Sequence, residues 1–533
     1  MPKKKRILPK MNKSDLFICD RKKNDTTFLR LFISTKIFFQ NLLLILLFLF
    51  LYQNSLFAQP VINHLVKTGL QYSYDFKWEK AKNIFEGLIK RYPSDPRGYH
   101  YESSIYLWYY LSNQDVENFQ TFISYSDTAI IKANNLLEKD PDNTDILYTL
   151  GSDYSYRAIA FIKAQKFLDA VWASKKSESY LNETLAKDSS KYDAYLGLGL
   201  YNFAVGQIPS AFKWALNLAG INGNVDNGLS LIHKAAENGN LAKVEAEYYS
   251  AQILSDFLDD YNAANRYLNN LTAMYPGNLL FRYSLAVLQI KKHNLNEAKI
   301  ILTKLLKNDN SDFKQLISFS EFLKGDIFFK ENQFDSAKTY YLNFLNNSPS
   351  NDYKGIAAFR LAVSYEITGN RAEAVKYYDL TGEGNMDLED DIYAKRKGEI
   401  FTKRTMAYTE MDAIKDENMI EDGRYKAAFD SLTSLLERIQ TDRLKAEVYL
   451  YLSNAAYYLG KYDESINFAL TAKVLNSDQE RWIKPFACYY AARADKKLKN
   501  TSAVINFVDE AKSYSDYDYQ KKLKNLLIAL TFK

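Results

Sequence analysis

Four histidines and two cysteines are the residues of this chain whose types best suit metal binding or nucleophilic chemistry. The histidines lie far apart in sequence, and no two have ligand spacing such as H-x-x-x-H. They are His64, His100, His233 and His293. Cys19 and Cys488 cannot supply a set of thiolates, so the sequence predicts no metal and no cofactor. Cys488 stands at an apolar helical position in FACYYAA, where we expect core packing rather than a reactive thiol.

Three other stretches have residue types that could carry chemistry, and each has a plainer interpretation. Residues 197–199 (G-x-G) lack the third glycine of a phosphate loop and follow no strand. Residues 222–226 place oxygen ligands at alternate positions, but the glycine and the later acid of a calcium loop are missing. We expect an inter-helix loop there, with Asp226 capping the next helix. Residues 388–391 are acidic and indicate a solvated linker rather than a cation site. No G-x-S-x-G or Walker sequence occurs, so we predict that the chain is not an enzyme.

A repeated pattern of helix pairs must position all other features. Its clearest copy, GDIFFKENQFDSAKTYYLNFLNNSP, covers residues 325–349. Small residues at Gly325 and Ala337 stand where two helices would cross, Tyr341 would fill the core, and a tight turn is expected at 332–333. One such pair cannot bury its own apolar face, so copies must stack.

The same spacing returns in residues 65–93, LVKTGLQYSYDFKWEKAKNIFEGLIKRYP. Together the two stretches resemble the tetratricopeptide repeat family, whose pattern of about 34 residues has Gly or Ala, then Tyr, Ala, Phe and Pro. Residues 193–240 are similar to the inclusion body clearance proteins and their bacterial relatives, a tetratricopeptide subgroup for which no reaction is known. The resemblance implies an all-α fold. We expect a right-handed α-solenoid of about eleven helix pairs, several degenerate, with a C-terminal capping helix.

The series of repeats is interrupted twice, which divides the chain into six predicted parts. The parts are a signal peptide (1–58), N-terminal repeats (59–192), an irregular repeat with an insertion (193–240), a regular array (241–380), a linker and long helix (381–422), and C-terminal repeats with a cap (423–533). Within them we expect an additional helix over 211–218 and one long polar helix over 392–417.

Residues 1–58 are predicted to be a cleaved signal peptide. A basic segment precedes the apolar run 42–52, and the small residue Ala58 stands before Gln-Pro, where we expect cleavage. An uncleaved membrane anchor is the alternative, and Met11 is an alternative start. Because no cysteine stands at the cleavage point, a lipid anchor is not expected. These features predict an exported protein of the bacterial periplasm or cell envelope.

The basic charge of the chain comes from this leader. It holds 11 of the 69 Lys and Arg residues but only 3 of the 64 Asp and Glu residues, so the remainder is slightly acidic. The sequence therefore predicts no nucleic-acid partner.

In tetratricopeptide arrays the first helix of each pair lines a concave groove, which suits recognition of a protein or peptide. The groove candidates that the resemblance implies are Tyr249, Tyr283, Phe322, Asp326, Phe359, Glu366, Asn454 and Tyr457. Some family members clamp a C-terminal carboxylate with Asn at the position of Asn454. Here the other units have Asp326, Val363 and Val287 at that position, so the clamp is absent.

These observations predict a non-enzymatic exported scaffold that binds a protein or peptide in its concave groove and organises an envelope complex. One alternative is a membrane-tethered assembly factor that retains its N-terminal anchor. The other is an enzyme with a pocket in residues 193–240. The titratable groups available to that pocket, beside lysines, are Asp193, Asp226, His233 and Glu237.

Overall fold

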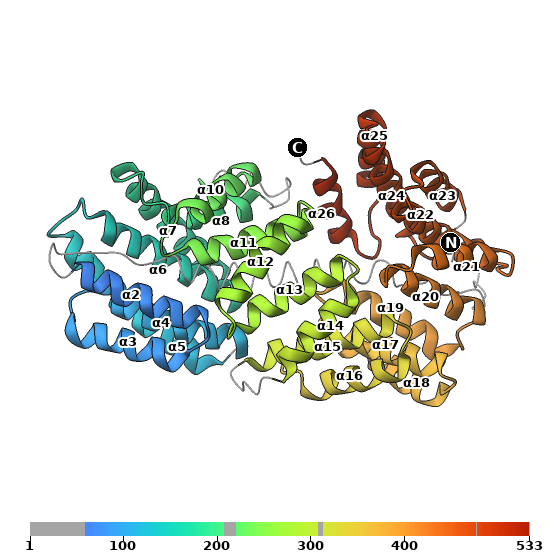
Figure 1. Cartoon of the computed structure of the whole chain (residues 1–533), viewed down its shortest axis with the longest axis horizontal. Coiled ribbons are helices and arrows are strands. Elements are labelled where there is room, and N and C mark those ends of the chain that lie inside the picture. Colours follow the sequence, from blue (N-terminus) through green and yellow to red (C-terminus); the bar gives the residue numbers. More distant parts are fainter. Residues whose placement is uncertain (1–58, 114, 207–219, 308–312, 476, 532–533) are drawn as a thin grey trace, which may run out of the picture. The chain divides into compact units, whose positions relative to one another are not determined.

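Helices joined by short turns make up the described chain (Figure 1). The computed structural model describes residues 59–531, except 114, 207–219, 308–312 and 476. These residues form 24 α-helices and one 3-10 helix, with no strand among them. The predicted signal peptide and the helix expected over 211–218 lie outside the described residues. No helix in the described ranges is long and apolar enough to cross a membrane.

The described residues divide into two compact units. The first unit contains the residues up to Leu323 and Asn347–Ser350, and the second contains Lys324–Asn346 and the residues from Asn351 onward. The first unit holds α2 (Gln59–Tyr74), α3 (Trp78–Arg91), α4 (Pro96–Asn113), α5 (Val116–Leu137), α6 (Thr144–Lys163), α7 (Phe167–Lys187), α8 (Ala194–Gly206), α10 (Val225–Asn238), α11 (Lys243–Asp256), α12 (Tyr261–Met274), α13 (Leu279–Lys291) and α14 (Leu295–Leu306).

The division falls within α15 (Lys314–Lys330). The second unit continues with α16 (Phe334–Asn347), α17 (Lys354–Ile367), α18 (Arg371–Asp379), η2 (Leu380–Glu383), α19 (Glu389–Lys403), α20 (Tyr408–Glu421), α21 (Tyr425–Leu436), α22 (Asp442–Tyr458), α23 (Tyr462–Val474), α24 (Ile483–Lys497), α25 (Thr501–Ser513) and α26 (Gln520–Thr531). The boundaries of the six parts predicted from the sequence stay predictions.

Successive helices pack against each other as pairs, which confirms the all-α solenoid. The eleven pairs are α2–α3, α4–α5, α6–α7, α8–α10, α11–α12, α13–α14, α15–α16, α17–α18, α20–α21, α22–α23 and α24–α25. Helix α19 stands between two pairs, and α26 is the predicted capping helix. Its leucines are buried against α24 and α25, and Glu389 accepts hydrogen bonds from the first backbone N–H groups, Lys521 (2.8 Å) and Lys522 (3.1 Å).

The glycine of the repeat pattern is required by the close crossing of two helices. A Cβ atom on Gly325 would lie 2.9 Å from the ring of Tyr341, and one on Gly69 would lie 2.3 Å from the ring of Phe85. Both aromatic rings are fully buried. The first helix therefore approaches the second so closely that only a residue without a side chain fits.

We expect Gly325→Ala to destabilise the second unit by about 1–3 kcal/mol, because the added methyl group overpacks a buried ring. The matched control is Gly87→Ala in α3, where a Cβ atom meets nothing within 4 Å. Alanine there should stabilise by about 0.5–1 kcal/mol through helix propensity. Urea unfolding of both variants measures the difference, and equal effects of the two substitutions would contradict the close crossing.

The structure corrects the expectation of one helix over 392–417. Helix α19 ends at Lys403 and α20 begins at Tyr408. The break is held by Glu410, whose carboxylate accepts hydrogen bonds from the Ala407 N–H at 2.8 Å and from the Arg404 guanidinium at 2.9 and 3.0 Å. A carboxylate in the first turn that accepts from the N–H of the N-cap residue, Ala407, marks the start of a new helix at this point.

Residues 381–391 are more ordered than a solvated linker. Asp390 and Asp391 are fully buried. The Asp391 carboxylate accepts hydrogen bonds from the backbone N–H groups of Tyr353 (2.9 Å), Ile356 (2.9 Å) and Asn385 (2.8 Å). Burial raises the pKa of Asp391 to about 7, although these hydrogen bonds act in the opposite direction. Asp391 therefore caps the start of α17 although it lies 35 or more positions later in the sequence, so no local sequence pattern reveals this cap.

Candidate partner-binding site

The first helices of the first unit close on one another, so their inner faces form a core. The Tyr74 hydroxyl at the end of α2 donates to the Leu241 carbonyl at 2.8 Å, and Asn278 donates to the Tyr74 carbonyl at 2.7 Å. Phe76 stacks on Phe313 with ring centroids 4.5 Å apart. These contacts join residues that are far apart in the sequence. A groove lined by these faces would have to open before it could admit a partner.

Three aromatic groove candidates lie inside this packing. Tyr249 (α11), Tyr283 (α13) and Phe322 (α15) are all fully buried. A fully buried ring presents no surface for contact, so their role toward a partner stays a prediction that requires these helices to separate. Their substitution would test packing rather than recognition.

Two further candidates form ion pairs inside the second unit. Asp326 on α15 accepts hydrogen bonds from Arg360 on α17 at 2.6 and 2.7 Å and from the Tyr341 hydroxyl at 2.6 Å. Glu366 accepts from Arg371 at 2.9 Å and from the Met406 N–H at 2.8 Å. Both acids are buried, so their charges hold helices together and are not offered to a partner.

The remaining three candidates also contact their own chain. Phe359 is buried, with its ring 5.5 Å from that of Tyr378. Asn454 is buried and accepts a hydrogen bond from Arg493 on α24. Tyr457 is half-buried, and the guanidinium of Arg493 lies 3.8 Å from its ring centroid, a cation–π contact. Of the eight candidates, Tyr457 alone keeps appreciable exposure.

The acids predicted for an enzymatic pocket in 193–240 do not converge. One oxygen of Asp193 accepts hydrogen bonds from the N–H groups of Asn240, Leu241 and Ala242 at 2.8 to 2.9 Å, before α11. Asp226 is exposed in the first turn of α10, and the helix is capped by Asn224 instead, which accepts from the Asn227 N–H at 2.9 Å. The predicted cap was therefore two residues too late.

His233 and Glu237 lie on the exposed face of α10. Their side chains are 3.2 Å apart, one helical turn from each other. They form an exposed surface pair, whereas the carboxylate of Asp193 is buried. Cys488 is buried, and burial raises the pKa of its thiol to about 12, which confirms that this cysteine is a packing residue.

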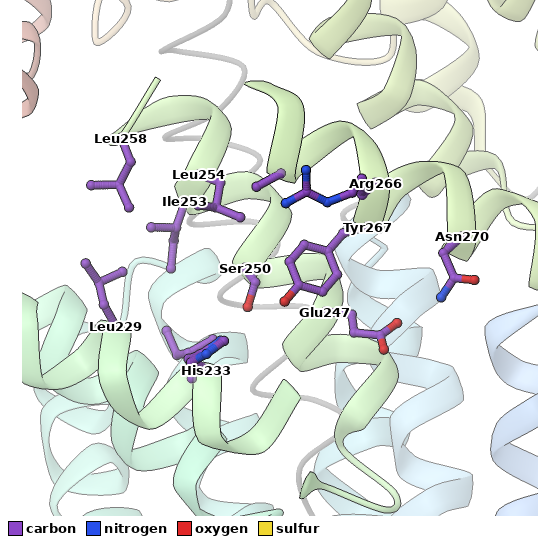
Figure 2. A pocket seen from close by; sticks show the side chains of 12 residues that line it. Leu229, His233, Glu247, Ser250, Ile253, Leu254, Leu258, Arg266, Tyr267 and Asn270 are labelled. Atoms are coloured by element: carbon purple, nitrogen blue, oxygen red, sulfur yellow. The ribbon is translucent and has the colours of Figure 1, made fainter. Parts of the chain in front are cut away.

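The candidate site is an open cavity of about 630 Å³ between α10, α11 and α12 in the first unit (Figure 2). It lies between the second helices of two successive pairs, above the first helix α11. Its lining residues are Leu229, Ile232, His233, Glu247, Ser250, Ile253, Leu254, Leu258, Ala263, Arg266, Tyr267 and Asn270. Figure 2 shows aliphatic side chains gathered at one side and the polar groups Glu247 and Asn270 at the other.

The helical period explains this two-sided lining. Residues 250, 254 and 258 follow each other at intervals of four, along one face of α11 and its end, while 266, 267 and 270 occupy one face of α12. Leu229, Leu254 and Leu258 are only half-buried, so aliphatic surface remains open to a ligand. The polar side offers a carboxylate, a guanidinium, a phenol and an amide.

The electrostatics of the polar side reflect partial burial. Burial raises the pKa of Glu247, while Lys243 and a hydrogen bond with Asn270 act in the opposite direction. Burial also raises the pKa of Tyr267, and the nearby carboxylates of Glu247 and Glu237 add to the rise. The tyrosine therefore stays a neutral hydroxyl that can donate or accept hydrogen bonds.

Family comparisons match two stretches of the chain. Residues 65–95 match the sequence model of the tetratricopeptide repeat, and residues 158–359 match that of Iml2/Tetratricopeptide repeat protein 39. The chain carries tetratricopeptide repeats. Both resemblances seen in the sequence are thereby confirmed, and the α10–α12 cavity lies within the second matched stretch. No curated protein matches the sequence.

Solved structures with tetratricopeptide-type helix pairs are similar over most of the chain. Yeast Tom70 is 15% identical, with 86% of this chain and 100% of that chain covered and a TM-score of 0.25. The APC/C hetero-tetramer Cut9–Hcn1 is 13% identical, with coverages of 86% and 94% and a TM-score of 0.25. The TPR domain of P58(IPK) is 14% identical, with coverages of 72% and 98% and a TM-score of 0.18.

Tetratricopeptide repeats are a type of protein-interaction scaffold. Sequence reasoning placed the contacts on the inner faces and missed the cavity. The signal that could have found it is the set of leucines at 229, 254 and 258, which extend the apolar surface beyond the stripe that packing requires.

Proposed function

We propose that this protein is a non-enzymatic scaffold that binds a segment of a partner protein in the α10–α12 cavity. The observation that carries the proposal is a lining with aliphatic side chains at one side and hydrogen-bonding groups at the other. Such a lining suits an amphipathic peptide whose apolar side chain enters while its polar groups meet the rim. The buried inner faces of both units favour this site over the concave groove.

The cavity volume fits one or two large apolar side chains, which would lie against Leu254 and Leu258. Arg266 and Glu247 carry opposite charges, so the rim favours a segment with both a donor and an acceptor rather than a highly charged one. The dispersed carboxylates of residues 193–240 support a binding role over a catalytic one, because general acid–base chemistry needs groups that converge on one substrate.

Site-specific photo-crosslinking tests this proposal. Benzoylphenylalanine introduced at the exposed residue Arg266 is expected to give one discrete adduct in cells. Leu254→Ser should reduce that adduct about tenfold, because it removes aliphatic surface from the lining. The matched control Ile300→Ser changes an exposed aliphatic residue of α14 outside the cavity and should leave the adduct unchanged.

Far-UV circular dichroism must show that both variants remain helical, and Leu258→Ser provides a second variant on the same side of the cavity. An adduct that persists in Leu254→Ser and Leu258→Ser would exclude the cavity as the binding site.

We further propose that the scaffold is exported to the bacterial periplasm or cell envelope, where it organises a complex. The basic segment, the apolar run 42–52 and Ala58 before Gln-Pro support export. N-terminal sequencing of the mature protein is expected to begin at Gln59. A sequence beginning at Met1 or Met11 would instead support the alternative of a membrane-tethered assembly factor.

A further inference from the structure

The start of α7 carries four large apolar side chains exposed to solvent. The exposed fractions are 63% for Phe167, 88% for Leu168, 43% for Val171 and 53% for Trp172. Leu168 is the most exposed large hydrophobic side chain among the described residues. We call these four residues the α7 patch. Single exposed apolar residues are common, but four within two helical turns indicate an interaction surface.

The helical period gathers the patch on one side of α7. Spacings of one, four and five residues place the four side chains within one broad arc of the helix. Ala170 and Ala173 occupy the opposite side, where they are buried as α7 packs on α6. The Trp172 indole makes an edge-to-face contact with the Tyr154 ring, with 5.4 Å between the ring centroids. The patch therefore projects away from the first unit.

Lysines surround the α7 patch. They are Lys163, Lys166, Lys175 and Lys176. Asp169 lies among them, and Glu178 forms an ion pair with Lys175 at 2.9 Å. Lys176 lies 5.8 Å from the Trp172 ring centroid, so positive charge reaches the apolar surface itself. The start of α5 lies beside the α6–α7 turn, since Lys166 is 5.4 Å from the Phe119 ring centroid, and it carries the acids Asp115 and Glu117.

We propose that the α7 patch docks the protein on an anionic lipid surface. Phe, Leu and Trp beside lysines are the side chains that enter the headgroup region, where indole is favoured and lysine meets lipid phosphate. This contact is independent of the peptide site, since the α10–α12 cavity shares no residue with the patch. It also does not need the N-terminal apolar run.

The charges favour lipid over a second copy of the chain. A two-fold contact through the patch would bring Lys163, Lys166 and Lys176 of each copy together, and like charges at an interface oppose association. An anionic membrane meets the same lysines with attraction. The exposure of the side chains also fits insertion, because Leu168 projects instead of lining a groove that a partner helix would fill.

Vesicle co-sedimentation tests the proposal on the chain from Gln59 to Lys533, which contains every helix that the structure describes. Vesicles of phosphatidylcholine with phosphatidylglycerol should bind it, and pure phosphatidylcholine should bind about tenfold less, because the lysines lose their partners. Leu168→Ser/Trp172→Ser should lower binding about tenfold or more. The control Ile300→Ser removes an aliphatic residue with 52% exposure and should bind like the wild type.

A second measurement localises the contact. If the Trp172 indole enters the membrane, brominated lipids should quench part of the tryptophan emission of the wild type. That quenched part should be missing from the emission of Trp172→Phe. Vesicle binding that survives Leu168→Ser/Trp172→Ser would overturn the proposal, as would absence of binding to anionic vesicles. Sedimentation as a dimer that this double variant converts to a monomer would overturn it too, in favour of a second copy as the occupant.

Discussion

Arg360→Met is expected to lower the free energy of unfolding of the second unit by about 3–5 kcal/mol. The substitution removes the donor to both oxygens of the buried Asp326 carboxylate, which keeps its hydrogen bond from the Tyr341 hydroxyl. A buried charge without its ion-pair partner is among the largest single destabilising effects. Urea unfolding measures the loss, and hydrogen exchange should show it in α15, α16 and α17.

Two controls distinguish the cost of leaving a buried charge unpaired from the cost of losing an ion pair as such. Asp326→Leu/Arg360→Met removes both charges together and should recover most of the stability, less about 1 kcal/mol for the hydrogen bond that Tyr341 loses. Lys426→Met breaks an ion pair with Asp430 on the surface and should cost less than about 1 kcal/mol. A double variant no more stable than Arg360→Met would contradict the assignment of the ion pair.

Glu102→Gln is expected to stabilise the first unit above pH 4.5, increasingly so toward pH 8. Glu102 is fully buried in α4, and neither carboxylate oxygen has a hydrogen-bond partner among the described residues. Burial raises its pKa from 4.5 to about 8; nearby Lys82 opposes the rise, and Glu86 and Glu79 add to it.

The sign follows from proton linkage. The folded chain holds the proton more tightly than the unfolded chain, so the stability of wild type is complete below pH 4.5 and falls as pH rises through 8. By pH 7 the loss amounts to about 3 kcal/mol, since each pH unit between the two pKa values costs about 1.4 kcal/mol. Glutamine resembles the protonated acid and carries no such dependence.

Melting temperatures of wild type and Glu102→Gln across this pH range measure the effect. The two proteins should have similar stability below pH 4.5, and their curves should separate as pH rises. The control is Glu138→Gln, which removes an exposed carboxylate directly after the end of α5. It should change the free energy of unfolding by less than about 0.5 kcal/mol. Parallel curves for wild type and Glu102→Gln would show that Glu102 is not buried in the folded chain.

The helix pairs could be predicted because their determinants are local. Gly69 and Phe85, or Gly325 and Tyr341, lie sixteen residues apart, and their contact follows from two helices and one turn. The break before α20 could not be predicted in the same way. It depends on the Glu410 carboxylate, which turns back to the N–H of Ala407 in a chain that otherwise reads as continuous helix.

The burial of the groove candidates could not be predicted because it depends on distant contacts. Tyr74 and Leu241 are 167 positions apart, and no local pattern states that α2 meets the start of α11. The groove residues named from the repeat pattern were placed on the correct helices. Their burial depends on how the pairs close on one another, as Asp326 and Arg360 do across two pairs.

The cavity depends on the spacing of α10 and α12, which the irregular stretch before α10 obscures in the sequence. Its polar residues, Arg266 and Tyr267, stand on the solvent side of a regular repeat. In that position they cannot be distinguished by type from ordinary surface residues. Their role emerges only when the aliphatic side chains of α11 are seen beside them (Figure 2).

The central claim is that a partner segment binds in the α10–α12 cavity. It is tested most directly by amide hydrogen exchange of the chain, measured with and without the partner identified by crosslinking at residue 266. The account predicts that bound partner slows exchange in α10, α11 and α12 and that Leu254→Ser abolishes the slowing. Slowing confined to α15, α17 and α22, the helices of the second unit that carry inner-face candidates, would contradict the account and restore the concave groove as the binding site.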